Sequence, residues 1–167
     1  PFRRRIVEQA YQRMLSPDFE SPLEADPTFC FTFDSVNYPA TRYYDGRIEF
    51  RNHYYLRPAQ MNSEEAKCAA FIDGLPEVEC WVRNLERNDY SFWLPTSTDR
   101  FYPDFVALLR DARVLIVEYK GADRLGNPDT IEKTIIGQIY EARSKGRCLF
   151  RMVGKSDYEA QILDALR

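Results

Sequence analysis

Arg100-Phe-Tyr-Pro-Asp-Phe-Val-Ala-Leu-Leu-Arg-Asp-Ala-Arg-Val-Leu-Ile-Val-Glu-Tyr-Lys-Gly121 is the stretch around which the rest of the chain is organised. Two apolar runs flank a polar tetrapeptide at 110–113, a pattern that predicts a β-hairpin. Asp104 interrupts the first run, and Glu118 and Lys120 lie near the end of the second. Charged side chains among Val, Ile and Leu are costly to desolvate unless something compensates them. A hard divalent cation bound to the carboxylate oxygens would do so.

The period of the strands relates these three side chains to one another. Alternate residues of a strand share a face, so Glu118 and Lys120 point the same way. A three-residue connection through 111–113 would pair Asp104 with Lys120 and place all three groups on one face. A four-residue connection would put Asp104 on the opposite face, unless a bulge near Pro103 brought it back. No glycine marks the turn, so the sequence leaves the register open.

The proline, aspartate, glutamate and lysine within 103–120 resemble the signature of the PD-(D/E)xK nuclease superfamily. The resemblance implies that Asp104 and Glu118 bind Mg²⁺, for which Mn²⁺ is expected to substitute. It also implies that Tyr119 offers its backbone carbonyl to the ion, and that Lys120 positions or deprotonates the attacking water. In this interpretation Asp104, Glu118 and Lys120 are the catalytic residues, and replacing any one by alanine should abolish cleavage and leave the fold largely intact.

The wider sequence resembles the C-terminal endonuclease region of Type III restriction enzyme cleavage subunits and related DEAD/DEAH-type proteins. The matching segments are Ala69–Val78, Trp81–Leu85, Ser91–Thr96, Thr98–Asp104 and Val117–Gly121. The resemblance implies DNA as the substrate, a role in restriction-modification and phage defence, and two partners outside this chain: an ATP-dependent motor region and a modification subunit. The chain has no Gly-x-x-x-x-Gly-Lys-Ser/Thr phosphate loop and begins at Pro1 inside an expected helix, so we expect a C-terminal fragment of a larger polypeptide.

The composition fits a globular protein. The 167 residues are 44% hydrophobic and 29% charged, enough for one domain or one domain with an appendage. The net charge of −3 argues neither for nor against nucleic acid, because a metal-dependent nuclease carries an acidic site of its own. No apolar run approaches the roughly 18–20 residues of a membrane span, so no membrane partner is expected. Four cysteines without CxxC spacing predict free thiols in a reducing cytoplasm instead of a zinc site.

The order of elements predicts an α/β (α+β) fold with a restriction-endonuclease-like core, in which helices flank a mixed β-sheet. We expect a helix and β appendage over 1–60 and the nuclease core over 61–167. The elements expected in the appendage are a helix at 2–15 and strands at 28–33, 42–44 and 48–56. Those expected in the core, besides the hairpin, are a helix at 63–72, strands at 78–85, 91–94 and 147–153, and helices from 129 or 130 to about 144 and at 157–166. The crossover helix predicts that the strand at 147–153 is parallel to the one that ends at Lys120.

Glu65 is our candidate for a further metal-binding carboxylate, because the superfamily often supplies one from the helix before the sheet. It lies in the first turn of a helix expected to be capped by Ser63 and shares a face with Ala69. Glu64 lies a third of a turn away and is the alternative. Acidic residues at this position are also favoured by the helix dipole without any metal.

Four polar residues near the motif are candidate DNA contacts. Thr98 and Arg100 lie in the loop that enters the Asp104 strand, and Lys133 and Gln138 lie on the helix after Lys120. Each could equally be a solvated surface residue.

Two rival interpretations use the same residues. One is a catalytically inactive relative that keeps the fold as a DNA-binding or assembly module. The other is a buried structural ion cluster of Glu118 with Lys120 that holds no metal, since structural ion pairs also place charged groups in strands. A glycosidase with two carboxylates fits poorly, because nothing in that chemistry explains Lys120 on the same face.

Overall fold

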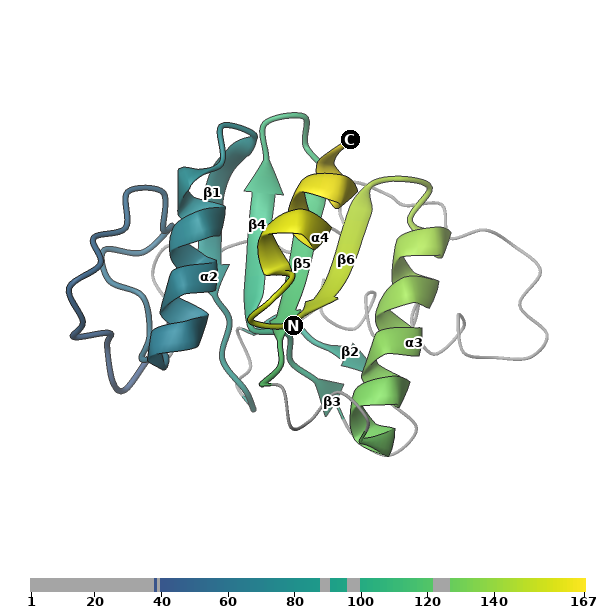
Figure 1. Cartoon of the computed structure of the whole chain (residues 1–167), viewed down its shortest axis with the longest axis horizontal. Helices are drawn as coiled ribbons and strands as arrows, with labels where there is room; N and C mark the ends of the chain where they lie inside the picture. Colours follow the sequence, from purple (N-terminus) through teal and green to yellow (C-terminus); the bar gives the residue numbers. More distant parts are fainter. Residues whose placement is uncertain (1–37, 39, 88–90, 96–99, 122–126) are drawn as a thin grey trace.

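A computed structural model describes residues 38, 40–87, 91–95, 100–121 and 127–167. In this part of the chain a mixed sheet of four strands is flanked by three helices (Figure 1). The strands, in spatial order, are β1 (Val78–Arg83), β4 (Phe105–Leu109), β5 (Val114–Tyr119) and β6 (Cys148–Val153). The helices are α2 (Ser63–Gly74), α3 (Pro128–Arg143) and α4 (Tyr158–Leu166). A separate two-stranded sheet contains β2 (Leu94–Pro95) and β3 (Arg100–Phe101).

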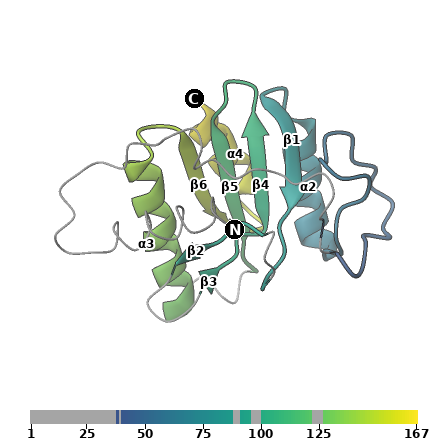
Figure 2. The ribbon, with the colours of Figure 1, turned by 180° about the vertical axis from the view of Figure 1, so that it is seen from behind.

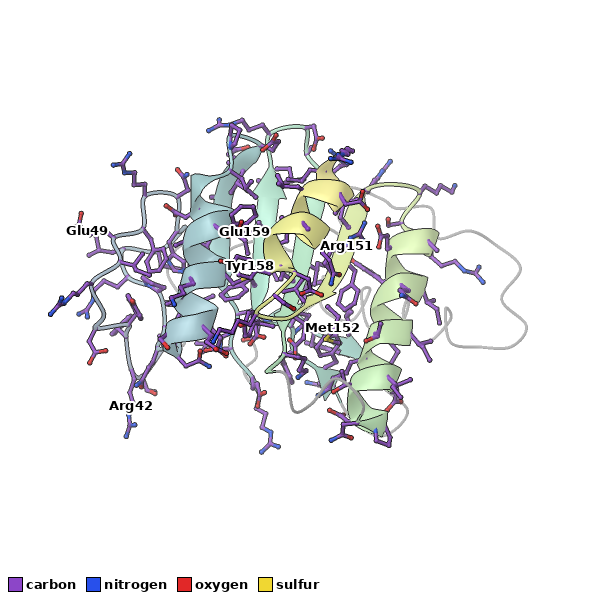
Figure 3. The ribbon with its side chains drawn as sticks, viewed as in Figure 1. Arg42, Glu49, Arg151, Met152, Tyr158 and Glu159 are labelled. Atoms are coloured by element: carbon purple, nitrogen blue, oxygen red, sulfur yellow. The ribbon has the colours of Figure 1, made fainter. Side chains whose placement is uncertain are left out.

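The predicted α/β architecture is confirmed. Strand β4 is antiparallel to both β1 and β5, and β5 is parallel to β6, as the crossover helix α3 requires. Helices α2 and α4 cover one face of the sheet; they lie in front of it in Figure 1 and behind it in Figure 2. Phe71 of α2 and Tyr158 of α4 contact each other there, with ring centroids 5.7 Å apart (Figure 3 labels Tyr158).

The opposite face packs against α3 and the β2–β3 pair. Ile136 of α3 joins Val106 and Ile116 of the sheet in a second buried cluster. Gly137 allows the helix to approach closely, because a Cβ atom there would lie only 2.3 Å from the ring of Phe150. The strands are therefore apolar on both faces. A charged residue within them is costly to bury unless a structural or functional partner compensates its charge.

Several expected boundaries differ from the observed ones. Asn62, not Ser63, caps α2: its side chain accepts from the N–H groups of Glu64 and Glu65, and Glu65 returns a bond to the Asn62 N–H in a capping box. Asn127 caps α3 in place of the expected Asp129 or Thr130, because Pro128 suits the first helical position. The strand expected at 91–94 is reduced to the two residues of β2, and β1 ends at Arg83.

The strands expected at 42–44 and 48–56 are wrong. This segment forms only isolated bridges, from Tyr43 to Ala59 and from His53 to Trp81. Its backbone donors bind elsewhere: Asp73 of α2 accepts the N–H groups of both Arg51 and Asn52. The helix expected at 2–15 and the strand expected at 28–33 lie outside the described residues.

Candidate functional site

The β4–β5 hairpin has a register that neither sequence alternative gave. Leu108 pairs with Val114, and the Leu109 N–H donates to the Arg113 carbonyl at 2.8 Å, which leaves 110–112 as the connection. Ala112 closes this connection with a φ of 69°. A three-residue hairpin loop of this kind usually places glycine at its left-handed position, so an alanine gave no signal in the sequence.

This register brings Asp104 and Glu118 to the same end of the sheet. Phe105 pairs with Val117, so Asp104 stands opposite Glu118 one residue further on. The Asp104 N–H donates to Glu118 Oε2 at 3.1 Å, and Asp104 Oδ2 accepts the Tyr119 N–H at 2.8 Å. The Glu118 carboxylate is thus bound to the Asp104 backbone, and the Asp104 carboxylate is bound to the backbone of Tyr119, the residue after Glu118. The two acids come together without a bulge between β4 and β5.

Lys120 completes the cluster. Its Nζ lies 2.6 Å from Glu118 Oε1, and the Glu118 side chain is only 6% exposed. Burial, reinforced by the Asp104 carboxylate, raises the pKa of Glu118 to about 8, against the lowering effect of Lys120. Burial would lower the pKa of Lys120, but the adjacent Glu118 carboxylate raises it instead, so the amine stays charged. At this site, therefore, the ionised form of Glu118 is disfavoured, and it lies beside the Lys120 amine, which stays charged.

Arg83, which sequence analysis missed, is the second cation of the site. It lies at the end of β1, where its Nη1 contacts Asp104 Oδ1 at 2.5 Å and its Nη2 lies 3.4 Å from Glu65 Oε1. The guanidinium packs over the ring of Phe105, 5.3 Å from its centroid. In the sequence Arg83 is one polar residue among several at the end of a strand, and only the pairing of β1 with β4 brings it to Asp104.

Asn84 is a further residue that sequence analysis missed. Its side-chain amide donates to the carbonyl groups of Phe92 and Pro103, both at 2.8 Å, and its backbone N–H donates to the Asp104 carbonyl at 2.8 Å. Asn84 is 5% exposed. It therefore fixes the chain immediately before β4 and helps to orient Asp104.

The two candidate helix carboxylates have different partners. Glu65 accepts from the Asn62 N–H and pairs with Arg83, so it belongs to the same charge cluster as Asp104. Glu64 lies 3.1 Å from Lys155 Nζ and accepts from the Tyr119 hydroxyl at 3.4 Å. In Glu65, Oε2 accepts from the Asn62 N–H and Oε1 pairs with Arg83. A metal-binding role for Glu65 stays a prediction.

The candidate DNA contacts have different partners, and the charge of one of them, Lys133, acts on Glu118. Arg100 is exposed and lies over the ring of Trp93, 4.4 Å from its centroid. Lys133 pairs with Asp129 at 2.7 Å and faces the ring of Phe101, and Gln138 is exposed on α3. Thr98 lies outside the described residues.

The donor set fits a small hard dication, although it does not form a closed cage. Within the described ranges, no group of three or more His, Cys, Asp or Glu side chains is placed to hold a metal ion. Mg²⁺ needs only one or two carboxylates and completes its shell with water and substrate oxygens. Asp104 and Glu118 supply those two, and each carboxylate oxygen keeps a lone pair beyond its present partner.

Comparison with known proteins adds no relative: no family model matches the chain, and neither the curated proteins nor the solved structures contain a match. Among the helices of the described residues, none has the length and apolar character needed to cross a membrane. Among the cysteines of the described residues, Cys68 and Cys148 are buried and Cys80 is half-buried.

Proposed function

We propose that this chain carries a metal-dependent endodeoxyribonuclease site that hydrolyses DNA phosphodiester bonds. The observation that supports it best is the meeting of Asp104, Glu118 and Lys120 at one end of a buried hairpin, with Glu118 linked to both of the others. This arrangement matches the roles that the sequence resemblance implies. A bound Mg²⁺ or Mn²⁺ would polarise the phosphate and lower the pKa of a water molecule.

The residues of the chain have distinct parts in this proposal. Asp104 and Glu118 would hold the metal, with the Tyr119 carbonyl as a further oxygen donor. Lys120 would orient the nucleophile and offset negative charge that develops on the phosphate, since its amine stays charged and its side chain is 14% exposed. Arg83 and Asn84 would hold Asp104 in place.

The sequence resemblance extends the proposal to the biological setting. The domain would be the cleavage module of a motor-coupled, Type III restriction-like enzyme in the cytoplasm, acting in phage defence with an ATP-dependent motor region and a modification subunit outside this chain. The free cysteines accord with a reducing compartment.

One observation favours the rival of a structural ion cluster or an inactive DNA-binding or assembly module. The four carboxylate oxygens of Asp104 and Glu118 all have partners without a metal: Arg83, the Tyr119 N–H, Lys120 and the Asp104 N–H. A cluster in which every carboxylate oxygen already has a protein partner can be purely structural. Metal binding therefore separates the two hypotheses.

The deciding experiment is nicking of plasmid and single-stranded DNA with Mg²⁺ or Mn²⁺. We expect Glu118→Gln, which keeps the shape of the side chain, to lower the rate by at least about 100-fold, the scale of losing one group that stabilises charge in the transition state. The control variant is Asp111→Asn. Asp111 lies at the far end of the same hairpin with its side chain 51% exposed, so this substitution should leave the rate of cleavage unchanged.

Calorimetric titration with Mg²⁺ covers the case in which cleavage needs the motor. Binding by the wild type and Asp111→Asn that disappears in Glu118→Gln would support a competent site. Absence of both cleavage and binding in the wild type would instead favour the structural or assembly module.

A further inference from the structure

Arg83 stands where its charge opposes a metal at Asp104. Its guanidinium contacts Asp104 Oδ1 directly, and its side chain is only 13% exposed. Burial acts to lower the pKa of Arg83, but the negative charges of three nearby acids outweigh it and raise the pKa. These acids are Asp104, Glu65 and Glu118. Inside the protein this charge is poorly screened, so a dication that approaches Asp104 meets a fixed positive group.

The contacts of Arg83 also differ from those of an optimised structural anchor. Its Nε atom is buried without a hydrogen-bond partner, and its link to Glu65 is long at 3.4 Å. The guanidinium has five donors, and a fully structural site would be expected to satisfy them all. With one donor unused, with Glu65 within 3.4 Å and with the Asp104 carbonyl 3.0 Å from Nη1, the guanidinium keeps partners if its bond to Asp104 Oδ1 is released.

We propose that Arg83 is a resident counter-ion that competes with a divalent metal for the Asp104 carboxylate, so that it sets the metal affinity of the site. The inference rests on the proposed function, because it assumes that Asp104 is a metal-binding residue. In the absence of metal, Arg83 neutralises Asp104 and keeps it oriented. On metal binding, Arg83 gives up its bond to Asp104 Oδ1 and keeps its contact with Glu65.

The test is a calorimetric Mg²⁺ titration of four proteins. Arg83→Gln removes the competing charge and should bind Mg²⁺ about tenfold more tightly, an order of magnitude set by the Coulomb interaction of nearby charges in a partly screened site. Arg83→Lys keeps the charge and should stay within about threefold of wild type on the same reasoning. Arg113→Gln, which removes an arginine paired with Asp111 at the far end of the hairpin, is the matched control and should bind like wild type.

A second measurement does not depend on the folding of an Arg83 variant. In the wild-type protein, the side-chain ¹⁵Nε resonance of Arg83, assigned by through-bond correlation to its own backbone, should shift as Mg²⁺ is added. The same titration of Glu118→Gln should leave the resonance in place, because that variant has lost a metal-binding residue.

The outcomes separate the two proposals. Equal or weaker binding by Arg83→Gln, or a wild-type Arg83 resonance that does not move while Mg²⁺ binds, overturns the counter-ion role and leaves the nuclease proposal standing. Binding by Arg83→Gln with none detected in the wild type supports the role strongly. No binding by any of the four proteins overturns the counter-ion role, and together with an absence of cleavage it overturns the nuclease proposal as well.

Discussion

Two carboxylates are buried in the part of the chain that the structure describes, and they are held in opposite ways. Asp73 is 8% exposed and accepts from the N–H groups of Arg51, Asn52 and the Trp81 indole, all of them uncharged donors. Glu118 is 5% exposed and lies between an ammonium group and a second carboxylate. Both are costly to bury, but only Glu118 has partners that are themselves ionised.

The difference identifies Asp73 as a structural acid and sets it apart from the candidate site. The donors of Asp73 belong to the backbone of a loop and to a core indole, so the carboxylate fixes that loop against α2 and β1. Glu118 is coupled to side chains whose charges a ligand could replace. Burial alone does not distinguish the two carboxylates, whereas the charge of their partners does.

The largest effect expected from breaking this comparison is on stability at Asp73. Asp73→Ala leaves three N–H donors without their acceptor, and we expect a loss of about 3 kcal/mol or more, since hydrogen bonds to charged groups each contribute about 1.5–3 kcal/mol. Glu118→Gln loses one of its two acceptor oxygens and leaves Lys120 without a counter-ion, but it also relieves the burial of an ionised carboxylate. We therefore expect a smaller net loss than at Asp73. Urea denaturation measures both. Equal losses at the two sites would remove the distinction.

The loop that Asp73 holds should also make stability depend on pH through His53. Burial lowers the pKa of His53 to about 4, against the raising effects of the Tyr55 carbonyl and Asp73, and its Nε2 accepts the Arg83 N–H. The unfolded chain binds a proton near pH 6.5 and the folded one only near pH 4. Stability is therefore complete above pH 6.5 and falls by about 3 kcal/mol as the pH drops to 4.

The measurement is urea denaturation at intervals from pH 7 to pH 4. His53→Gln cannot titrate, so its stability should fall less steeply than that of the wild type over this window. Parallel slopes for the two proteins would show that His53 does not carry the effect.

A smaller effect of the opposite sign is expected at the hairpin turn. Ala112 has a φ of 69°, a conformation that costs an alanine about 1 kcal/mol. Ala112→Gly should therefore raise stability by about 0.5–1 kcal/mol, after allowing for the greater freedom of glycine in the unfolded chain. Thermal unfolding would show it, and a lowered midpoint would argue against the left-handed turn.

The smallest effect is expected at the exposed pair of Arg113 and Asp111. These side chains are 29% and 51% exposed and 2.7 Å apart. Arg113→Ala should change stability by less than about 0.5 kcal/mol, because solvent screens such pairs. Urea denaturation of Arg113→Ala and Lys120→Met would compare the exposed ion pair of the hairpin with the buried one. A large loss of stability in Arg113→Ala would contradict the expected contrast.

The sequence predicts the fold well where periodicity decides it. The hairpin, the crossover helix and the parallel strand at Cys148–Val153 follow from apolar runs that local physics can interpret. The sequence predicts that Asp104 and Glu118 can lie together on the hairpin, but the observed register is neither of the two alternatives, because an alanine occupies the left-handed turn position. Arg83 could not be identified, since its acidic partners lie 18 and 21 positions away. Asp73 could not be identified either, since two of its three donors belong to loop backbone more than 20 positions away.

The segment around His53 has a consequence for handling this protein. The Trp81 N–H donates to the Asn52 carbonyl, and the Tyr54 N–H donates to the Trp81 carbonyl, so 52–54 occupies the outer hydrogen-bonding positions of edge strand β1. A shortened protein that starts at 61, where the sequence places the core boundary, would expose that edge and the ring of Trp81. We expect such a protein to self-associate by edge-to-edge pairing, whereas one that keeps 38–60 should stay monodisperse.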